Sequence, residues 1–345
     1  MIKLLDCTLR DGGYINDWNF GYDAIIDIIK SLEKTNVDII EVGFLKDEPY
    51  DKDRAVFNDM NQINEILCNK RKNINYAAMV EVFSPIPIES LPERSNKTVD
   101  TIRVIVWKTK HDSNNNELDA LEDGYKFCKG VVERGYNLCI QPARVDQYTE
   151  QEFVDMVKKF TGLKPYAVYI VDSWGTRQVD EIIRYAHLAD RNMDSKIALG
   201  YHGHNNMLQA YGNAASFIHC RFNRDLIVDG SVYGIGRCAG NLNIETFAKY
   251  LNDTEKKGYV LEPLYEIYEK YIKKIYKKQR WGYSIYYFLT AVYNAHPNYA
   301  LYLGHQKGLD VLEFEKLISS VTPIDRVLYS REKADRYLSV MKGQC

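Results

Sequence analysis

Short runs of apolar and β-branched residues recur along the first two-thirds of the chain, and helical patterns separate most of them. This alternation predicts parallel strands joined by crossover helices. The predicted strands are residues 2–7, 38–43, 75–80, 101–106, 137–141, 167–171, 197–201 and 226–229. The predicted helices are residues 22–33, 55–67, 118–133, 150–160, 177–189, 207–219 and 244–251.

Eight such strands predict an α/β fold, a (β/α)8 TIM barrel, over residues 1–255. A barrel of this kind takes about 250 residues, whereas a doubly wound sheet usually has fewer strands and a point at which the strand order reverses. Residues 81–100 are the weakest unit because they contain three prolines. Residues 256–345 show helical periodicity without strand signals, so we expect a helical C-terminal domain there.

Composition narrows the class of protein. A chain of 345 residues with a net charge of -2 is too long for a small disulfide scaffold and gives no electrostatic reason to expect nucleic acid or a membrane as partner. It has no apolar run of about 18 residues and no apolar region of a signal peptide at its start. Seven cysteines without a CxxC pair favour free thiols in a reducing compartment, so we expect a cytoplasmic protein.

Tyrosine is the one unusual component, with 27 copies. Many of them lie between Tyr259 and Tyr302, beside Lys273, Lys274, Lys277, Lys278 and Arg280. Aromatic and basic residues together can form a stacking platform for nucleic acid. The spacing favours amphipathic helices whose tyrosines lie along a half-buried face.

In a TIM barrel the reactive side chains follow the C-terminal ends of the strands. Arg10 and Asp11 follow the first predicted strand and precede two glycines, which let the backbone approach a ligand. His202 and His204 follow the seventh strand, and their spacing on an extended chain points both imidazoles to one face. Two adjacent imidazoles repel each other when protonated, so this arrangement predicts a metal site.

The ends of the sixth and eighth strands add further polar groups. Asp172 and Ser173 follow the sixth strand, where such residues can bind substrate or cap a helix. Residues 233–241 follow the eighth strand and contain the spacing GxGxxxG. A dinucleotide site requires GxGxxG at the start of a βαβ unit, so we do not expect one. A flexible loop that brings Asn241 or backbone amides to the barrel mouth fits better.

One carboxylate, two imidazoles and an amide oxygen form a mixed set of ligands that suits Mn²⁺, Mg²⁺, Co²⁺ or Zn²⁺ with open water positions. Such an ion can chelate the carboxylate and the keto oxygen of a 2-oxo acid. Together with a nearby arginine it stabilises the enolate formed when a carbon–carbon bond is cleaved or a proton is removed. The sequence therefore predicts a divalent metal ion as cofactor.

Four motifs occur in order at the expected strands: Thr8-Leu9-Arg10-Asp11-Gly12, Ile40-Glu41-Val42-Gly43, His202-Gly203-His204-Asn205 and Ala239-Gly240-Asn241. Through them the chain resembles the DRE-TIM metallolyases, over roughly residues 3–250. Within that family the likeness is greatest to the 4-hydroxy-2-oxovalerate aldolase branch. The tail around Tyr283 and Tyr286 also resembles the C-terminal domain of that branch.

The resemblance implies a function for each matching residue. Asp11, His202 and His204 are the implied metal ligands, with Asn241 as an additional ligand. The other implied site residues are Arg10 as the enolate stabiliser, Glu41 as a group that orients others near the metal, Ser173 as the partner of the substrate carboxylate, and Tyr283 and Tyr286 from the tail.

Tyr14 is where the sequence departs from the aldolase branch, which has its catalytic histidine at that position. The acidic Gly-Glu-Gln pattern of the synthases of the family is also missing. A tyrosine with the ordinary pKa of about 10 is a poor base at neutral pH, so we favour substrate fit as the function of Tyr14. The base stays open between Tyr14 with a lowered pKa, a metal-bound water and another side chain, such as His111 after the fourth strand.

These features favour a divalent-metal-dependent aldolase or lyase that acts on a 4-hydroxy-2-oxo acid through a metal-held, pyruvate-type enolate. The alternatives are a Claisen-type synthase that joins acyl-CoA to a 2-oxo acid, a barrel that binds without catalysis, and Schiff-base chemistry at Lys108 or Lys110, which needs a desolvated lysine. The expected partner is a small-molecule 2-oxo acid. A homodimer is compatible with the sequence, which assigns no dehydrogenase partner.

Overall fold

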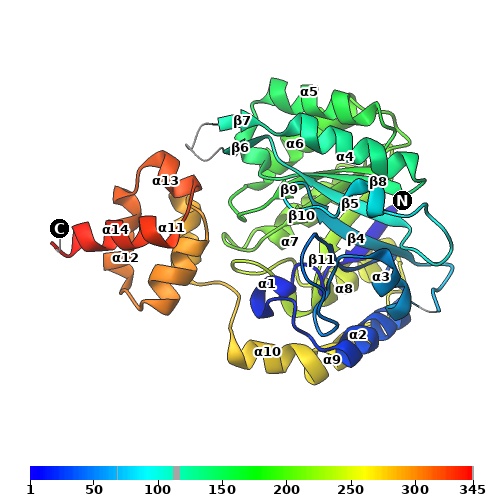
Figure 1. Cartoon of the computed structure of the whole chain (residues 1–345), viewed down its shortest axis with the longest axis horizontal. Helices are drawn as coiled ribbons and strands as arrows, with labels where there is room; N and C mark the ends of the chain where they lie inside the picture. Colours follow the sequence, from blue (N-terminus) through cyan, green and yellow to red (C-terminus); the bar gives the residue numbers. More distant parts are fainter. Residues whose placement is uncertain (68, 112–116, 344–345) are drawn as a thin grey trace.

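The computed structural model describes residues 1–67, 69–111 and 117–343, which form a closed parallel barrel followed by helices (Figure 1). The barrel strands are β1 (Ile2–Asp6), β2 (Ile39–Leu45), β4 (Asn75–Glu81), β5 (Thr101–Val106), β8 (Asn137–Pro142), β9 (Ala167–Asp172), β10 (Ala198–Gly203) and β11 (Leu226–Gly230). Each of them overlaps one predicted strand. The predicted TIM barrel is therefore confirmed.

The strand order places the predicted site residues at one mouth of the barrel. The order is β1-β11-β10-β9-β8-β5-β4-β2, and the pairing of β1 with β2 closes it. At the C-terminal edge Asp6 pairs with Gly230, and Gly203 pairs with Asp172. Residues that follow β1, β9, β10 and β11 therefore emerge side by side.

Helices cover the outside of the barrel. The long ones are α2 (Tyr22–Lys34), α3 (Met60–Ile66), α4 (Leu121–Glu133), α5 (Glu150–Thr161), α6 (Val179–Arg191), α7 (Ala210–His219) and α8 (Ile244–Glu255). Short turns are α1 (Gly13–Asn16), η1 (Ile88–Ser90), η2 (Val145–Gln147) and η3 (Val232–Gly234). The long helices turn apolar faces to the strands, and α5, for example, buries Phe153, Val157 and Phe160.

The helix predicted over residues 55–67 begins later than expected, at Met60. The preceding Val56–Phe57 forms β3, which extends the sheet parallel to the end of β2. Asp59 starts α3, because its side chain accepts a hydrogen bond from the backbone N–H of Asn61. The sequence prediction was wrong at this end because buried apolar residues suit a short strand as well as a helix.

Two other helices, over residues 121–133 and 210–219, each begin three residues later than predicted. Glu117–Asp119 forms β7, which pairs antiparallel with β6 (Thr109–His111), so α4 starts only at Leu121. The Asp119 carboxylate accepts the backbone N–H of Leu121 at 2.7 Å and marks this start. The helix predicted from residue 207 begins after Leu208, whose left-handed φ of 56° is incompatible with an α-helix.

The weak unit at residues 81–100 contains only η1 and no α-helix. Ile88 of η1 packs closely on α4 at Gly130, where an added Cβ would lie 2.4 Å from Cγ1 of Ile88. An extended, proline-containing chain thus covers the barrel where the other units place a helix.

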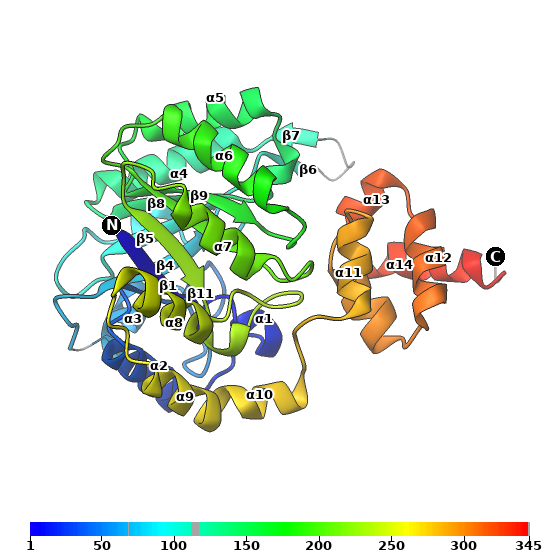
Figure 2. The same cartoon turned by 180° about the vertical axis from the view of Figure 1, so that it is seen from behind.

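The residues after the barrel are helical, as predicted. They form α9 (Glu262–Ile267), η4 (Tyr268–Ile272), α10 (Lys273–Lys278), α11 (Ile285–Val292), η5 (Ala300–Gln306), α12 (Val311–Ser320), α13 (Pro323–Val327) and α14 (Arg331–Met341). Figure 2 shows α11 to α14 as a separate group beside the barrel, joined to it by the segment after α10. We call this group the helical domain.

The two parts have separate apolar cores. The barrel cluster extends through Leu264 and Ile272 to Trp281, so α9 and α10 pack on the barrel. The helical domain has its own cluster, which includes Leu289 and Phe314 and, among the described residues, reaches the barrel only at Cys238 and Ala239 of the loop after β11. Because the cores separate after Trp281, we propose the domain boundary there, rather than between residues 255 and 256 as the sequence suggested.

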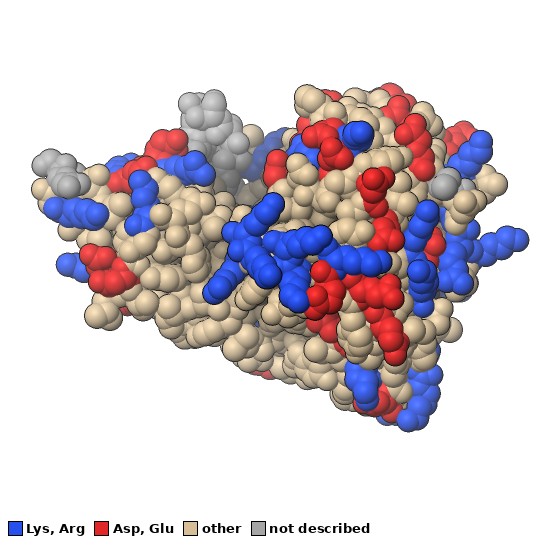
Figure 3. All heavy atoms as spheres, turned by 90° about the horizontal axis from the view of Figure 1, so that it is seen from below, with Lys and Arg blue, Asp and Glu red and all other residues tan. Residues whose placement is uncertain are grey.

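Tyr268 and Tyr276, near α10, are half-buried, as expected for amphipathic helices. The ring of Tyr233 lies 4.7 Å from that of Tyr268 and 5.3 Å from that of Tyr276. Figure 3 shows basic side chains gathered on the outside of α10, with acidic ones next to them. One ion pair in this region joins Nζ of Lys273 to Oε2 of Glu269, at 2.7 Å.

The cysteines that the structure describes are all free: Cys7, Cys128, Cys139, Cys220 and Cys238. In the same part of the chain, no helix is long and apolar enough to cross a membrane.

Candidate active site

A cavity of about 520 Å³ opens at the C-terminal mouth of the barrel, where the helical domain faces it. The barrel contributes polar side chains to its wall, among them Arg10, Asp11, Tyr14, Ser173, His202 and His204. The tail contributes His296, Val327, Leu328 and Tyr329. A volume of this size is typical of small-molecule sites.

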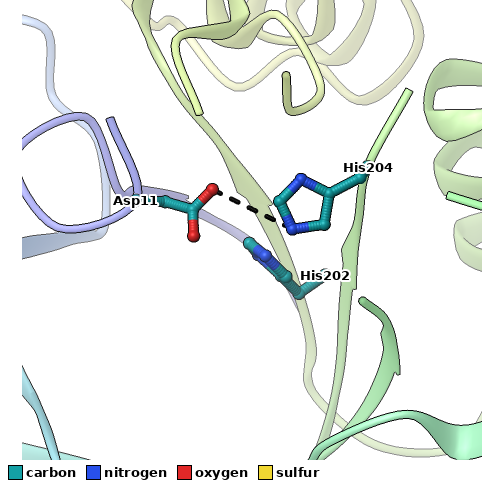
Figure 4. Close-up of side chains that lie close together, drawn as sticks. All are labelled: Asp11, His202 and His204. Carbon is teal, nitrogen blue, oxygen red and sulfur yellow. Dashed lines mark ion pairs between the residues drawn. The ribbon is translucent and has the colours of Figure 1, made fainter. Parts of the chain in front are cut away.

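Asp11, His202 and His204 lie together in this wall, and their ligand atoms are all within 4.8 Å of one another (Figure 4). Asp11 follows β1, whereas both imidazoles come from the end of β10 and the residue after it. Nε2 of His204 lies 4.0 Å from Oδ2 of Asp11. A buried carboxylate and two imidazoles are a suitable set of ligands for a divalent ion.

Two of these residues are held in the protonation states that metal binding requires. Burial raises the pKa of the Asp11 carboxyl, but the charge of Arg10, which pairs with it, outweighs this effect and holds the pKa well below its usual range. Burial also lowers the pKa of His204 to about 3. At neutral pH, Asp11 is therefore ionised and His204 is a neutral imidazole, the form that coordinates metals.

Asn241 lies against the same group. Its Nδ2 donates to the Ile235 carbonyl at 3.0 Å and to the Ser231 hydroxyl at 3.3 Å. Its Oδ1 is buried without a partner among the described residues. An added Cβ on Gly236 would lie 2.3 Å from this amide nitrogen and 2.7 Å from Oδ2 of Asp11, so glycine permits the close packing. The unpaired oxygen shows that these residues fit a divalent ion.

A series of buried ion pairs links Arg10 and His202 through the barrel interior. Nε of Arg10 lies 2.7 Å from Glu41, and Nη1 of Arg103 lies 2.8 Å from the same oxygen of Glu41. Arg103 also pairs with Asp229, which in turn lies 3.1 Å from Nδ1 of His202. Glu41 therefore holds the guanidinium of Arg10. This contact agrees with the function that the resemblance implies for Glu41, which is to orient groups near the metal.

Tyr14 stands in the cavity wall on α1. Its ring lies 4.8 Å from that of Trp18, and the Arg237 guanidinium is 5.4 Å from its centroid. Burial raises the pKa of Tyr14 to about 12. This opposes the alternative in which Tyr14 acts as a base with a lowered pKa.

The other implied residues divide between the cavity and the helical domain. Ser173 lines the cavity, and its Oγ accepts the backbone N–H of Arg144 at 3.1 Å. Tyr286 packs against Phe314 inside the helical domain and donates to the Leu309 carbonyl at 2.7 Å. Tyr283 is 52% exposed. Neither tyrosine belongs to the described lining of the cavity, so the structure gives no support for their implied catalytic function.

The lysines considered for Schiff-base chemistry are ion-paired and not desolvated. Nζ of Lys108 lies 2.9 Å from Glu152, and Lys110 pairs with Asp123. The lysine side chains are 24% and 39% exposed. His111 ends β6, and its side chain lies outside the described residues. The structure therefore offers no desolvated lysine at these two positions.

Among the cavity residues that the sequence analysis did not propose for the site are Glu81, Arg144, Arg237 and His296. Glu81 ends β4 and Arg144 follows β8, so inspection of every strand end could have found both. Arg237 lies in the glycine-rich loop that was noted for Asn241. His296 comes from the helical domain, and no local pattern signals that this segment faces the barrel.

The profile of the HMGL-like family matches residues 1–269. The chain belongs to the HMGL-like family. This agrees with the resemblance to the DRE-TIM metallolyases, and the match spans the whole barrel of this HMGL-like chain.

Curated relatives of this HMGL-like protein carry the names of lyases. A 4-hydroxy-2-oxovalerate aldolase of Bacillus cereus is 24% identical over 267 residues, which are 76% of this chain and 72% of the relative. An oxaloacetate decarboxylase of Mycobacterium tuberculosis is 23% identical over 261 residues, which are 74% of this chain and 71% of the relative. The predicted enzyme class, a carbon–carbon lyase, agrees with these names.

Solved structures support the fold. The N-terminal domain of a candidate aldolase from Bacteroides vulgatus has a TM-score of 0.68 at 20% identity and matches 97% of this HMGL-like chain and 99% of its own. An HMG-CoA lyase from Brucella melitensis has a TM-score of 0.59 at 15% identity and matches 77% of this chain and 95% of its own. The first likeness includes the helical domain as well as the barrel.

Proposed function

We propose that this protein is a divalent-metal-dependent aldolase or lyase that cleaves or forms a carbon–carbon bond in a 4-hydroxy-2-oxo acid, with pyruvate or a related 2-oxo acid as the half retained at the site. The observation that carries the proposal is the convergence of Asp11, His202 and His204 in a cavity whose wall includes Arg10. The family and the names of the relatives support the same chemistry.

The ligands of the ion would be Asp11, His202 and His204, with the free Oδ1 of Asn241 as a further oxygen ligand. When bound, a divalent ion supplies Lewis-acid polarisation of the keto group. Ser173, which lines the cavity, would bind the carboxylate of the substrate.

Cleavage of a 4-hydroxy-2-oxo acid needs a base for the hydroxyl proton. The C3–C4 bond then breaks, its electron pair forms the enolate of the 2-oxo acid, and the aldehyde leaves. Arg10 would stabilise the enolate oxygen, because its guanidinium is a rigid charged donor held by Glu41. Reprotonation of the enolate at C3 releases the 2-oxo acid.

Glu81 is our choice for the proton acceptor. In the described lining of the cavity, Glu81 is the one carboxylate besides Asp11. Nε1 of Trp107 donates to it at 3.2 Å and fixes its position. The raised pKa of Tyr14 makes the phenol a weaker candidate for the base, and leaves it as a wall that shapes the substrate site.

The test is metal-dependent release of pyruvate. Protein stripped by a chelator and protein reloaded with Mn²⁺ are each incubated with 4-hydroxy-2-oxovalerate and longer 4-hydroxy-2-oxo acids. We expect release of pyruvate only by the reloaded protein, and His202→Ala should lose metal and activity while keeping its circular dichroism spectrum. Absence of cleavage by the metal-loaded protein, or cleavage that survives metal removal, would overturn the proposal.

Decarboxylation of oxaloacetate is a second candidate. It passes through the same pyruvate enolate, since the bond that breaks is again next to C3 and the leaving group is carbon dioxide. The Mycobacterium tuberculosis relative named for this reaction favours its inclusion in the screen.

A further inference from the structure

The helical domain brings His296 against Arg237 in the wall of the cavity. Nε2 of His296 lies 3.0 Å from Nη2 of Arg237. On the other side of the ring, the backbone N–H of Asn298 donates to Nδ1 of His296 at 3.1 Å. Nδ1 is therefore an acceptor, so a neutral His296 carries its proton on Nε2. Two hydrogen-bond donors thus face each other with no acceptor between them.

The charge of Arg237 has no close partner in the part of the chain described. Among the described residues, no carboxylate oxygen lies within 4.0 Å of its guanidinium nitrogens. Asp11 and Glu81 act on it only from farther away. Its backbone N–H lies 3.4 Å from Oδ2 of Asp11, so Arg237 adjoins the proposed metal ligands.

A second arginine lines the same cavity. The Arg144 guanidinium stacks 3.2 Å from the centroid of the Trp174 ring, whose centroid lies 5.6 Å from that of His296. Arg144 pairs with Asp146 and lies 3.4 Å from the side-chain oxygen of Asn294, but its Nη1 is buried without a partner among the described residues. This side of the cavity therefore holds more hydrogen-bond donors than acceptors.

We propose that Arg237 and the Nε2–H of His296, with Arg144 beside them, form a subsite for a carboxylate at the far end of the substrate. A carboxylate oxygen between Arg237 and His296 would accept from both and would satisfy the two opposed donors. The inference rests on the proposed function and specifies its substrate class: a 4-hydroxy-2-oxo acid whose aldehyde half carries a second negative charge.

The residues of the subsite differ from those assigned to the 2-oxo acid end of the substrate. That end is assigned to Asp11, His202, Arg10 and Ser173, which all follow barrel strands or end them. His296 instead belongs to the helical domain. An anion held there belongs to the part of the substrate that extends away from the barrel, and the helical domain thereby selects the aldehyde.

The test compares two five-carbon 2-oxo acids that differ only at the far end. Metal-loaded protein is titrated calorimetrically with 2-oxoglutarate, which has the distal carboxylate, and with 2-oxovalerate, which has a methyl group. A charge-assisted pair predicts a preference for 2-oxoglutarate of roughly ten- to a hundredfold. Arg237→Gln should remove most of this preference, and His296→Phe, which keeps the ring but not the donor, should reduce it. Arg336→Gln, on exposed α14, is the matched control and should keep it.

Equal affinity of the wild type for the two acids, or an unchanged preference in both Arg237→Gln and His296→Phe, would overturn the subsite. If either variant fails to fold, the other still decides the question. The outcome for the proposed function is separate: a preference that Arg237→Gln removes, without cleavage of any 4-hydroxy-2-oxo acid, would support the subsite and overturn the aldolase activity. Cleavage with equal affinities would do the reverse.

Discussion

The carboxylate of Asp229 lies 3.1 Å from Nδ1 of His202. This contact fixes the orientation of the imidazole, because Nδ1–H donates to the carboxylate and Nε2 is left to face the cavity. Arg103 pairs with the same carboxylate and balances its charge in the barrel interior. The tautomer of a proposed metal ligand is thus set by two residues that lie beneath the cavity and outside its described lining.

We expect Asp229→Asn to weaken metal binding by about 10- to 100-fold, because an amide at this position holds the imidazole less firmly and makes it a weaker ligand. The measurement is the dissociation constant for Mn²⁺ or Zn²⁺ from competition with a chromophoric chelator. Asp225→Asn is the control, since Asp225 precedes the same strand but pairs at the surface with Lys3. Wild-type affinity in a folded Asp229→Asn protein would show that Asp229 does not support the metal site.

The order and type of the barrel elements could be predicted because each strand is a short apolar run between helical patterns. The errors occurred where a local contact decides a boundary. Asp59 starts α3 at Met60, and Leu208 excludes a helical turn through its left-handed backbone. Neither the cap at Asp59 nor the backbone conformation of Leu208 changes the apolar periodicity. The pattern alone therefore did not show where these helices begin.

For the site, the sequence could predict only the residues that lie at the C-terminal ends of the barrel strands. Asp11 follows β1 and His202 lies at the end of β10, which only β11 separates from β1, so knowledge of the fold is enough to bring them together. Arg103 could not be found in this way, because it lies within β5 and reaches Glu41 and Asp229 through the barrel interior. His296 depends on the placement of a second domain, which no sequence motif specifies.

Arg10→Ala should lower kcat by about 10²–10³-fold, because it removes an oriented charged donor from the site where the enolate charge develops. Arg10→Lys should recover little of this loss, since a point charge cannot replace a guanidinium fixed by Glu41. The measurement is kcat for pyruvate release, with metal content recorded for each variant. Arg54→Ala is the control, because Arg54 forms its ion pairs with Asp17 and Glu48. A kcat near the wild-type value would remove Arg10 from the mechanism.

Glu81→Gln should reduce kcat by about 10²–10⁴-fold without loss of metal, because the amide cannot accept the hydroxyl proton but can keep the hydrogen bond from Trp107. Steady-state kinetics together with metal analysis checks this expectation. Glu89→Gln, at an exposed position on η1, should retain the wild-type rate. If Glu81→Gln turns over normally, another group accepts the proton.

Borohydride reduction in the presence of pyruvate should leave the protein without a covalent adduct. The reason is that Lys108 is engaged in an ion pair with Glu152 and is partly exposed, whereas a Schiff base needs a free, desolvated lysine. Intact-mass spectrometry after reduction is the measurement. A mass increase that maps to Lys108 or Lys110 would favour Schiff-base chemistry over a metal-held enolate.

Tyr14→Phe should leave kcat almost unchanged. Burial raises the pKa of Tyr14 to about 12, so the phenol is protonated at every pH at which the enzyme would be assayed, and removal of the hydroxyl takes away no titrating group. The direction of the pH dependence is testable. If Tyr14 were the base, kcat would increase as pH rises toward the pKa of Tyr14, and Tyr14→Phe would lose that increase. We expect superimposable pH profiles of kcat between about pH 6 and 10 for the two proteins. Because the ring packs on Trp18, Tyr14→Ala should instead raise KM by opening the wall of the cavity. A loss of roughly 10²-fold or more in Tyr14→Phe would make this tyrosine the residue that transfers the proton.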